Sequence, residues 1–219
     1  MALKRNNPVR HILITAGPTR EMLDPVRFIT NLSTGEMGYA IAREAKRKGL
    51  KVTLISGPTA LNVPKGIRFV PIVSVSDLDG ALGKHFPACD LLVMAAAVGD
   101  FIPLRRSSQK IHRGKKWSVE FRQAPDLVRK VAAKKETRLV VGFSLETQDW
   151  LRRSHAKLAK KKLDGIVANY FTGGHNPFGK TDTHVALIDR KRTQVLHFPS
   201  KTEFARRLLG WAVDLKKYS

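Results

Sequence analysis

Unbroken runs of Val, Ile and Leu recur along this 219-residue chain and limit the folds that it can adopt. Strands that are buried on both faces have such continuous hydrophobicity, whereas strands with one wet face alternate apolar and polar residues. The runs lie at residues 11–15, 52–56, 90–94, 139–143 and 165–168. Helical segments separate them, for example around Met37, Ile41 and Ala45, which share one helix face. The alternation predicts a Rossmann-like, doubly wound α/β fold with a mostly parallel sheet.

The last quarter of the chain departs from this alternation. Residues 184–189 and 193–198 have the pattern of two strands that flank a tight basic turn, which predicts a C-terminal antiparallel hairpin at one edge of the sheet. Pro71 lies within another β-like run, 69–73, and cannot donate a ladder hydrogen bond. This strand is therefore also predicted at an edge.

Two helix starts are expected where a serine precedes an acidic residue by three positions. Ser76 with Asp79 and Ser200 with Glu203 both have the spacing of a capping box, in which the two side chains satisfy N–H groups of the first helical turn.

Composition favours a single domain. A chain of 219 residues, 42% of them hydrophobic, can bury a substantial core, so residues 1–219 are predicted to form one domain in which 1–10 are flexible. The chain has no apolar run of the roughly 20 residues that a membrane helix needs and no apolar core of a signal peptide, which predicts a cytoplasmic protein. The single cysteine, Cys89, is expected to be a buried, unreactive thiol. The histidines lack zinc-ligand spacing, so no structural metal is predicted.

The chain carries a formal net charge of +22, with 40 Lys and Arg against 18 Asp and Glu. Such a field attracts anions, and two classes of partner fit it: nucleic acid and small polyphosphate substrates. The basic residues are dispersed over most of the chain and form no recognisable groove-reading element, so much of the charge fits a solvated surface.

A long segment rich in glycine and hydroxyl groups joins the first apolar run to the first helix. Gly17, Gly35 and Gly38, with Asn31 among them, lie where a βα unit binds ligand phosphates. They are too far apart for the G-x-G-x-x-G fingerprint of a dinucleotide site. A loop of this length usually carries function in a compact domain, an ordinary surface loop being the alternative.

A second irregular segment, 95–116, follows the run at 90–94, and ligands of open α/β sheets bind outside the carboxyl ends of strands. Its small residues at 95–100 let a ligand approach the backbone. Basic residues follow, and 101–117 are predicted to form a mobile lid over a polyphosphate. A solvated loop is the alternative.

Six ordered motifs give the chain a family resemblance. They read I-T-A-G-P-T-R-E at 14–21, D-P-V-R-F-I-T-N-L-S-T-G-E-M-G at 24–38, A-A-A-V-G-D at 95–100, A-P-D-L-V at 124–128, V-G-F-S-L-E-T at 141–147 and K-L-A-K-K-K-L-D at 157–164. From residue 11 to the C-terminus, the chain resembles phosphopantothenoylcysteine synthetase, the synthetase half of the bacterial coenzyme A bifunctional protein.

The resemblance implies a ligase of coenzyme A biosynthesis. In such an enzyme CTP activates the carboxylate of 4'-phosphopantothenate as an acyl cytidylate and releases pyrophosphate, and the amine of cysteine then displaces CMP. The resemblance implies Mg²⁺ with the nucleotide, leaves ATP open in place of CTP, and implies a homodimer in which the lid region of one protomer borders the other's site. No flavin is expected in this chain, although a flavin-dependent decarboxylase partner is open. Neither a membrane nor a specific nucleic acid is an expected partner.

The resemblance also implies site residues. Asn31 would bind the activated acyl group, because a carboxamide can donate a hydrogen bond to a developing oxyanion; its alternative role is that of a turn residue. Lys110 would act from the lid on the acyl cytidylate step. Nucleotide contacts are predicted for Gly17, Ser33, Gly35, Met94, Ala95, Ala96, Asp100, Lys110, Pro125, Asp126, Leu127, Val128, Phe143, Lys157 and Lys161, and metal ligands are not assigned.

Structural roles compete with these functional ones. Asp126 is also a good N-cap, and Phe143 ends a strand where core packing would explain it. Lys157 and Lys161 share one face of a predicted helix, where two like charges repel unless they share a polyphosphate, and solvated lysines are the alternative.

The chain departs from the family pattern at two places. His112 and Arg113 stand where the family's lid motif has lysines, and histidine is only partly protonated at neutral pH. We therefore expect weaker lid closure, or help from Lys115 and Lys116. Asn169 is followed by tyrosine instead of aspartate and is a weak site candidate.

Two other functions share some of these features. An NAD(P)-binding oxidoreductase would have the same fold class, but it needs a tight glycine fingerprint and an acidic residue after the second strand, where this chain has Ile55-Ser-Gly-Pro58. A basic nucleic-acid-binding protein is suggested by charge alone, with few clustered aromatic residues for base stacking.

Overall fold

The computed structural model describes residues 8–114, 116–172, 178 and 183–215. Residues 1–7 of the segment predicted to be flexible, and Lys115 of the predicted lid, lie outside this part of the chain. The strands of the main sheet are β1 (His11–Ala16), β4 (Lys51–Ser56), β5 (Arg68–Pro71), β6 (Leu91–Met94), β9 (Leu139–Glu146), β10 (Gly165–Tyr170), β11 (Thr183–Asp189) and β12 (Thr193–Phe198). The helices are α1 (Glu36–Arg47), α2 (Val75–His85), α3 (Leu127–Ala132), α4 (Trp150–Lys160) and α5 (Lys201–Asp214), with a 3-10 turn at Phe86–Ala88.

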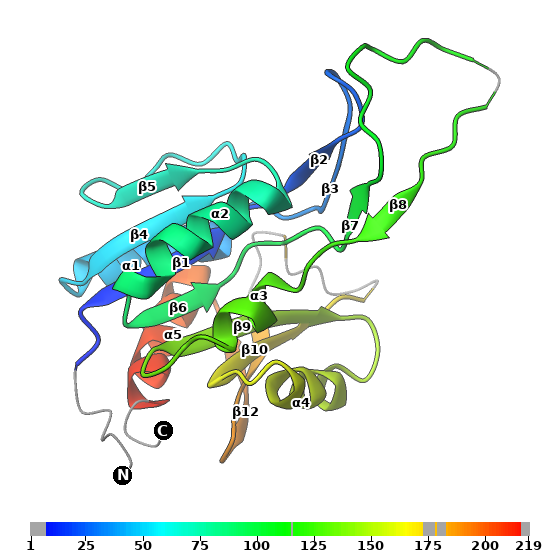
Figure 1. The fold of residues 1–219 in the computed structure, drawn as a ribbon. Helices are drawn as coiled ribbons and strands as arrows, with labels where there is room; N and C mark the ends of the chain where they lie inside the picture. The colour runs from blue at the N-terminus through cyan, green and yellow to red at the C-terminus, as the bar shows by residue number, and fades with distance from the viewer. Residues whose placement is uncertain (1–7, 115, 173–177, 179–182, 216–219) are drawn as a thin grey trace.

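These strands form one eight-stranded sheet in the order β12-β11-β10-β9-β6-β1-β4-β5 (Figure 1). The strands from β10 to β5 run parallel, whereas β11 and β12 are antiparallel and form one edge. The predicted α/β fold, its C-terminal edge hairpin and the edge position of the strand with Pro71 are thus confirmed. Strand order reverses between β1 and β6, which is where open α/β sheets bind their ligands.

Both faces of the sheet are covered, which explains the unbroken apolar runs. In β1, Ile12 and Ile14 pack with α1 and α5 on one face, whereas Leu13 packs with α2, α3 and α4 on the other. All three side chains are fully buried. Each such side chain contributes about 1.5–3 kcal/mol when it is removed from water. The alternation of strand side chains therefore builds two cores on one sheet.

The start of α2 differs from the prediction. Its N-cap is Ser74, whose hydroxyl accepts from the N–H of Asp77, while the Asp77 carboxylate accepts from the N–H of Ser74. Ser76, the predicted cap, lies inside the first turn. The Ser-x-x-Asp spacing occurs twice in this segment, and burial of Val75 at the first helical position selects the earlier register. At α5 one of the two bonds of the predicted capping box is found, because Ser200 accepts from the N–H of Glu203.

Cys89 is buried beside the start of β6, as predicted. Burial raises the pKa of its thiol to about 12, so the thiol stays protonated and unreactive at neutral pH. Within the part of the chain that the structure describes, no helix combines the length and hydrophobicity needed to cross a bilayer.

Two small two-stranded sheets project from the body (Figure 1). The first, here called the hairpin, is residues 20–30, with β2 (Arg20–Met22) paired to β3 (Phe28–Thr30). The second, here called the arm, is residues 101–123, with β7 (Phe101–Pro103) paired to β8 (Phe121–Gln123). The long segments expected as irregular loops therefore contain antiparallel pairs, which satisfy backbone groups that a free loop would leave to solvent.

Replacement of Ser74 by alanine tests the position of the α2 cap. We expect Ser74→Ala to lower the free energy of unfolding by about 1 kcal/mol, because an N–H of the first turn loses its acceptor. Ser76→Ala is the matched control and should be neutral or slightly stabilising, since alanine favours a helix interior. Chemical denaturation of both variants measures the two values, and a larger loss for Ser76→Ala would contradict the cap.

Candidate functional site

A cavity of about 780 Å³ opens at the carboxyl ends of β6, β9 and β10. Its walls come from the loop before α1, the segment after β6, the start of α3 and one side of α4. The segment that leads from β1 to α1 and the segment after β6 both line it, which places it at the switch point of the sheet. A cavity of this size can hold a nucleotide.

Hydrogen bonds join the two loops that form the floor of this cavity. Thr19 N donates to Ala97 O at 3.2 Å, and Ala97 N donates to Gly17 O at 2.9 Å. The hydroxyl of Thr19 accepts from Gly99 N at 2.9 Å. These bonds join residues that are about 80 positions apart in sequence.

The N-terminus of α1 opens into the cavity. Gly35 is its N-cap, with a φ of 82° that favours glycine. Gly38 touches the end of β1, since a Cβ there would lie 2.5 Å from the Cβ of Ala16. The close approach brings the first N–H groups of a 12-residue helix to the cavity, and such a terminus attracts anions.

All the predicted site residues except Gly17 and Lys110 line this cavity. The lining members are Asn31, Ser33, Gly35, Met94, Ala95, Ala96, Asp100, Pro125, Asp126, Leu127, Val128, Phe143, Lys157 and Lys161, and the weak candidate Asn169 joins them. Gly17 lies behind the wall, where a Cβ would come 2.9 Å from Cγ2 of Thr59. Its φ of 68° gives it a structural reason to be glycine.

Asn31 turns its amide nitrogen toward the loop after β6. Its Nδ2 donates to the carbonyls of Ala97 and Val98, at 3.3 and 3.1 Å. The side chain is otherwise exposed on the cavity wall. The hydrogen-bond donor that the predicted role requires is therefore engaged with backbone here, and the carboxamide must turn to reach a ligand.

Two residues that are predicted to contact the nucleotide also have the structural roles that the sequence suggested as alternatives. Asp126 is the N-cap of α3, because its carboxylate accepts from Arg129 N at 3.1 Å. Phe143 packs edge-on against Phe204, with ring centroids 6.5 Å apart, while its other side faces the cavity. Both residues can serve packing and ligand at once.

Lys157 of α4 and Lys161, the C-cap residue of this helix, meet carboxylates at the cavity wall. Lys157 Nζ lies 2.5 Å from an oxygen of Glu146 and 3.2 Å from the hydroxyl of Ser144. Lys161 Nζ lies 3.1 Å from a carboxylate oxygen of Asp126. The two like charges on one helix face are thus stabilised separately, one from β9 and one from α3.

Three charged residues at or next to this wall were not predicted as site residues from the sequence. They are Glu146, Lys201 and Glu36. Glu146 ends β9 with its side chain largely buried under Lys157. Lys201, the first residue of α5, lines the cavity and pairs with Glu36 of α1. Glu146 stands inside the V-G-F-S-L-E-T motif, so a carboxylate there was visible in sequence, whereas nothing local connects residues 36 and 201.

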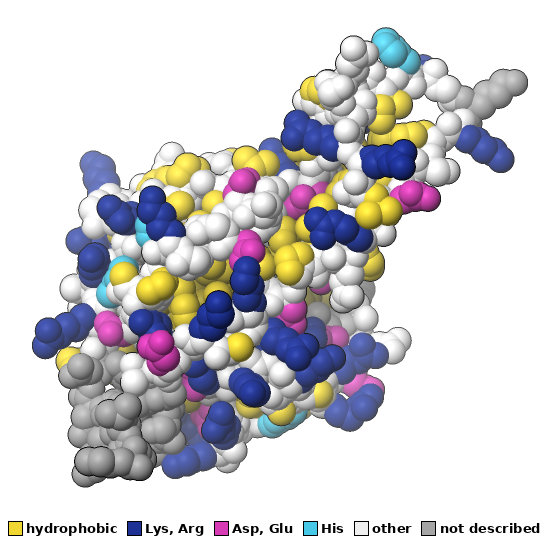
Figure 2. Space-filling model, viewed as in Figure 1, with side chains coloured by type: hydrophobic (Ala, Val, Ile, Leu, Met, Phe, Trp, Pro, Cys, Tyr) yellow, Lys and Arg dark blue, Asp and Glu magenta, His cyan; other side chains and the backbone are white. Residues whose placement is uncertain are grey.

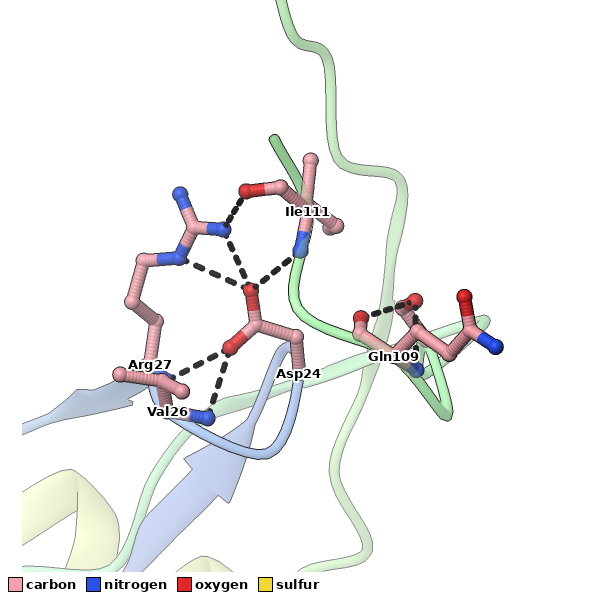
Figure 3. Close-up of polar contacts among 6 residues, drawn as sticks. Asp24, Val26, Arg27, Gln109 and Ile111 are labelled. Atoms are coloured by element: carbon pink, nitrogen blue, oxygen red, sulfur yellow. Dashed lines mark hydrogen bonds and ion pairs between the residues drawn. The ribbon is translucent and has the colours of Figure 1, made fainter. Parts of the chain in front are cut away.

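Lys110 lies outside the cavity, on the exposed outer part of the arm. The next residue, Ile111, is bound to Asp24 and Arg27 of the hairpin (Figure 3). The exposed His112 and Arg113 follow in the same stretch. In this arrangement the predicted lid is docked on the hairpin, so a direct role for Lys110 needs the arm of another protomer or a movement of its own.

The visible surface shows Lys and Arg side chains scattered over the body and the arm (Figure 2). They do not gather into one stripe on this face, in keeping with the dispersed charge of the sequence. Among the described residues there is also no group of three or more His, Cys, Asp or Glu side chains arranged to hold a metal ion.

Comparison with known proteins gives the family. Residues 8–215 match the family described as DNA/pantothenate metabolism flavoprotein C-terminal domain. The coenzyme A biosynthesis bifunctional protein CoaBC of Bacillus subtilis is 42% identical over 212 residues, which cover 95% of this chain and 52% of that protein. Its counterpart in Vibrio cholerae is 37% identical over 204 residues, 91% of this chain and 51% of that protein. The chain spans about half the length of these curated relatives.

A solved structure extends the likeness to three dimensions. The crystal structure of the C-terminal domain of a CoaBC bifunctional protein is 33% identical, has a TM-score of 0.80, and is matched over 96% of this chain and 97% of that chain. The match to the family includes all six motifs noted in the sequence. The chain therefore belongs to the family of the DNA/pantothenate metabolism flavoprotein C-terminal domain, and the resemblance drawn from those motifs is confirmed.

Proposed function

We propose that this chain is a ligase that joins 4'-phosphopantothenate to cysteine with CTP, as the family membership suggests. The observation that carries the proposal is the cavity at the switch point, whose walls collect residues from all the family motifs except I-T-A-G-P-T-R-E. Such a cavity would hold the phosphates of a nucleotide at the α1 N-terminus and its base among the small residues after β6.

The reaction has two steps in this proposal. A carboxylate oxygen of phosphopantothenate bonds to the α-phosphorus of CTP, the bond from that phosphorus to the bridging oxygen breaks, and pyrophosphate leaves. The amine nitrogen of cysteine then bonds to the acyl carbon, the bond from this carbon to the phosphate oxygen breaks, CMP leaves, and the amine loses a proton. The protein's part is to hold the phosphates and to stabilise the charge of the second step.

Three lysines at the wall would bind phosphate oxygens by exchanging partners. Lys157 would leave Glu146, Lys161 would leave Asp126, and Lys201 would leave Glu36. The Lys161–Asp126 pair is partly exposed, and such pairs contribute only about 0–1 kcal/mol, whereas the buried Glu146 also accepts a hydrogen bond from Ser144 and lies 3.8 Å from Arg153. Asn31 would turn its amide from the carbonyls of Ala97 and Val98 to the acyl oxygen.

Mg²⁺ belongs to the proposal through the nucleotide. The lining carboxylates Glu36 and Asp126 have lysine partners, whereas Asp100 has no ion pair among the described residues. One carboxylate without an ion pair suits Mg²⁺, which is commonly held by substrate phosphates, waters and one or two carboxylates. When bound, the ion would neutralise phosphate charge, and Asp100 is the residue that would hold it.

The projecting strands support a homodimer. Apolar side chains on the hairpin, the arm and the loop beside them are exposed, among them Leu32 at 79%, Phe101 at 61% and Val26 at 59%. Such apolar groups on a monomer surface favour a partner surface. The bifunctional relatives, about twice as long as this chain, support a decarboxylase partner on a separate or connected chain.

The reaction is tested with the purified protein and Mg²⁺. With CTP and phosphopantothenate alone, we expect about one equivalent of pyrophosphate, and with cysteine added, continuous release, because the amine clears the intermediate. ATP, GTP and UTP in parallel reactions define the nucleotide. Release that is independent of phosphopantothenate would contradict the proposal.

Replacement of Asn31 by aspartate tests its part in the second step. The carboxylate would face two backbone carbonyls and an anionic intermediate, so we expect transition-state stabilisation to fall by about 3 kcal/mol, on the order of a hundredfold in kcat. Asn62→Asp, the same change in an exposed loop, should leave kcat unaltered. Near-native turnover by Asn31→Asp would remove Asn31 from the mechanism.

Kinetic measurements distinguish the roles of Lys110 in the arm and Lys157 in α4. We expect Lys157→Gln to raise the KM for CTP about tenfold, since a charge-assisted contact to the ground-state nucleotide is lost. Lys110→Gln should lower kcat with little change in CTP affinity, because its contact forms only near the transition state.

Calorimetry of CTP binding and single-turnover measurements give the two quantities separately. Lys160→Gln is the control on α4, since its exposed side chain does not line the cavity. Equal losses of CTP affinity in Lys110→Gln and Lys157→Gln would show that the two lysines have the same task.

A further inference from the structure

The arm is attached to the hairpin at two points in the segment that follows β7. Ser107 N donates to Leu23 O at 2.9 Å. Four residues further on, Ile111 reaches the turn of the hairpin, where Asp24 and Arg27 bind it (Figure 3). The second attachment is next to Lys110, the arm residue to which the proposed function assigns a catalytic part.

The two carboxylate oxygens of Asp24 have different tasks. Oδ1 accepts from the N–H groups of Val26 and Arg27, both at 2.8 Å, and so closes the hairpin turn. Oδ2 accepts from Nε and Nη2 of Arg27, at 2.8 and 2.5 Å, and from Ile111 N at 3.2 Å. One oxygen therefore shapes the hairpin, and the other joins it to the arm.

Asp24 is fully buried although it lies in a projecting segment. Desolvation alone would raise the pKa of its carboxyl, but hydrogen bonds from Val26, Arg27 and Ile111 outweigh this and hold the pKa well below its usual range. The carboxyl is thus ionised at neutral pH, and an isosteric amide could not accept all five bonds.

Arg27 completes the attachment. Its Nη2 donates also to Ile111 O at 2.5 Å, so the N–H and the C=O of Ile111 are both bound. The guanidinium lies over the ring of Trp117, 5.0 Å from the ring centroid, on the returning side of the arm. Asp24 orients this guanidinium through two hydrogen bonds and thereby acts on both sides of the arm.

We propose that Asp24 is a positioning residue that fixes the backbone of Lys110 through the N–H of Ile111. The peptide group between residues 110 and 111 is planar, so a hydrogen bond at its N–H also fixes the direction of the Cα of Lys110. Because Lys110 lies outside the cavity of its own chain, a fixed backbone suits an arm whose lysine side chain reaches the site of another protomer. The inference rests on the proposed function in one respect, the catalytic part of Lys110.

Asp24→Asn is the direct test. The amide keeps an oxygen for Val26 and Arg27, but its NH₂ group would oppose the donors of Arg27 and Ile111. We expect kcat to fall on the order of tenfold to a hundredfold, while the KM for CTP stays within about twofold, since misplacement affects only the later step. The control is Glu44→Gln, which removes another buried carboxylate paired with arginines, Arg47 and Arg206, far from the arm.

Two further measurements separate positioning from general stability. Hydrogen exchange followed by mass spectrometry should show faster exchange at residues 105–114 in Asp24→Asn and unchanged exchange there in Glu44→Gln. The double variant Asp24→Asn/Lys110→Gln should be no slower than Lys110→Gln alone, because Asp24 acts through that lysine. Additive losses, or unchanged exchange at these residues in Asp24→Asn, would overturn the proposal.

A second variant keeps the test decisive if Asp24→Asn does not fold. Ile111→Pro removes the N–H of the arm and leaves the pair of Asp24 and Arg27 in place. Ser108→Pro makes the same change where the N–H has no partner among the described residues. Only Ile111→Pro should lower kcat, and equal losses in both would refute the proposal. If the wild-type protein makes no amide at all, the proposed function itself fails, whereas the exchange data still decide whether Asp24 holds the arm.

Discussion

The parallel pairing of β1 with β6 determines where the loops of the candidate site lie. β1 is buried along its whole length and lies at the centre of the sheet, with β4 on one side and β6 on the other. The register that places Thr15 opposite Met94 brings the loops after both strands together. Thr15 Oγ1 then accepts from Ala96 N at 3.1 Å, and the cavity opens above this contact. A shift of one residue would reverse which side chains enter each core and would separate the two loops.

Electrostatics at the cavity differ from the overall charge of the chain. The net charge of +22 is dispersed, whereas the lining lysines each have a carboxylate partner. Such pairing holds the lysine side chains near the cavity before a ligand arrives, and it limits repulsion among them. A bound polyphosphate would supply anionic oxygens to these lysines in place of the carboxylates. The site is thus arranged to exchange the carboxylate partners of its lysines for the phosphate groups of a ligand.

The hairpin and the arm have a different source of order. They are thin and expose many apolar groups, so a hydrophobic core cannot stabilise them. They are connected by the hydrogen bond from Ser107 N to Leu23 O and by the buried carboxylate of Asp24, which binds the guanidinium of Arg27 and the N–H of Ile111. This carboxylate accepts five hydrogen bonds, which defines the position of this small segment. These contacts fix the position of the arm on the hairpin, as hydrophobic packing fixes the elements of the body.

Sequence by itself determined the fold class, the edge positions of the C-terminal hairpin and of the strand with Pro71, the family, and most of the cavity wall. The hydrophobic pattern of the sequence indicates which faces of helices and strands are buried, and the spacing of the motifs indicates which loop follows which strand. Only the tertiary structure decided that Ser74 and not Ser76 caps α2, that Gly17 lies behind the wall, that Glu146 holds Lys157, and that Asp24 binds Ile111. Local patterns describe contacts within a few residues, and the Ser-x-x-Asp signal occurs twice within such a window. Contacts such as 24 with 111 depend on where two separate segments are placed by the sheet, which no local pattern encodes.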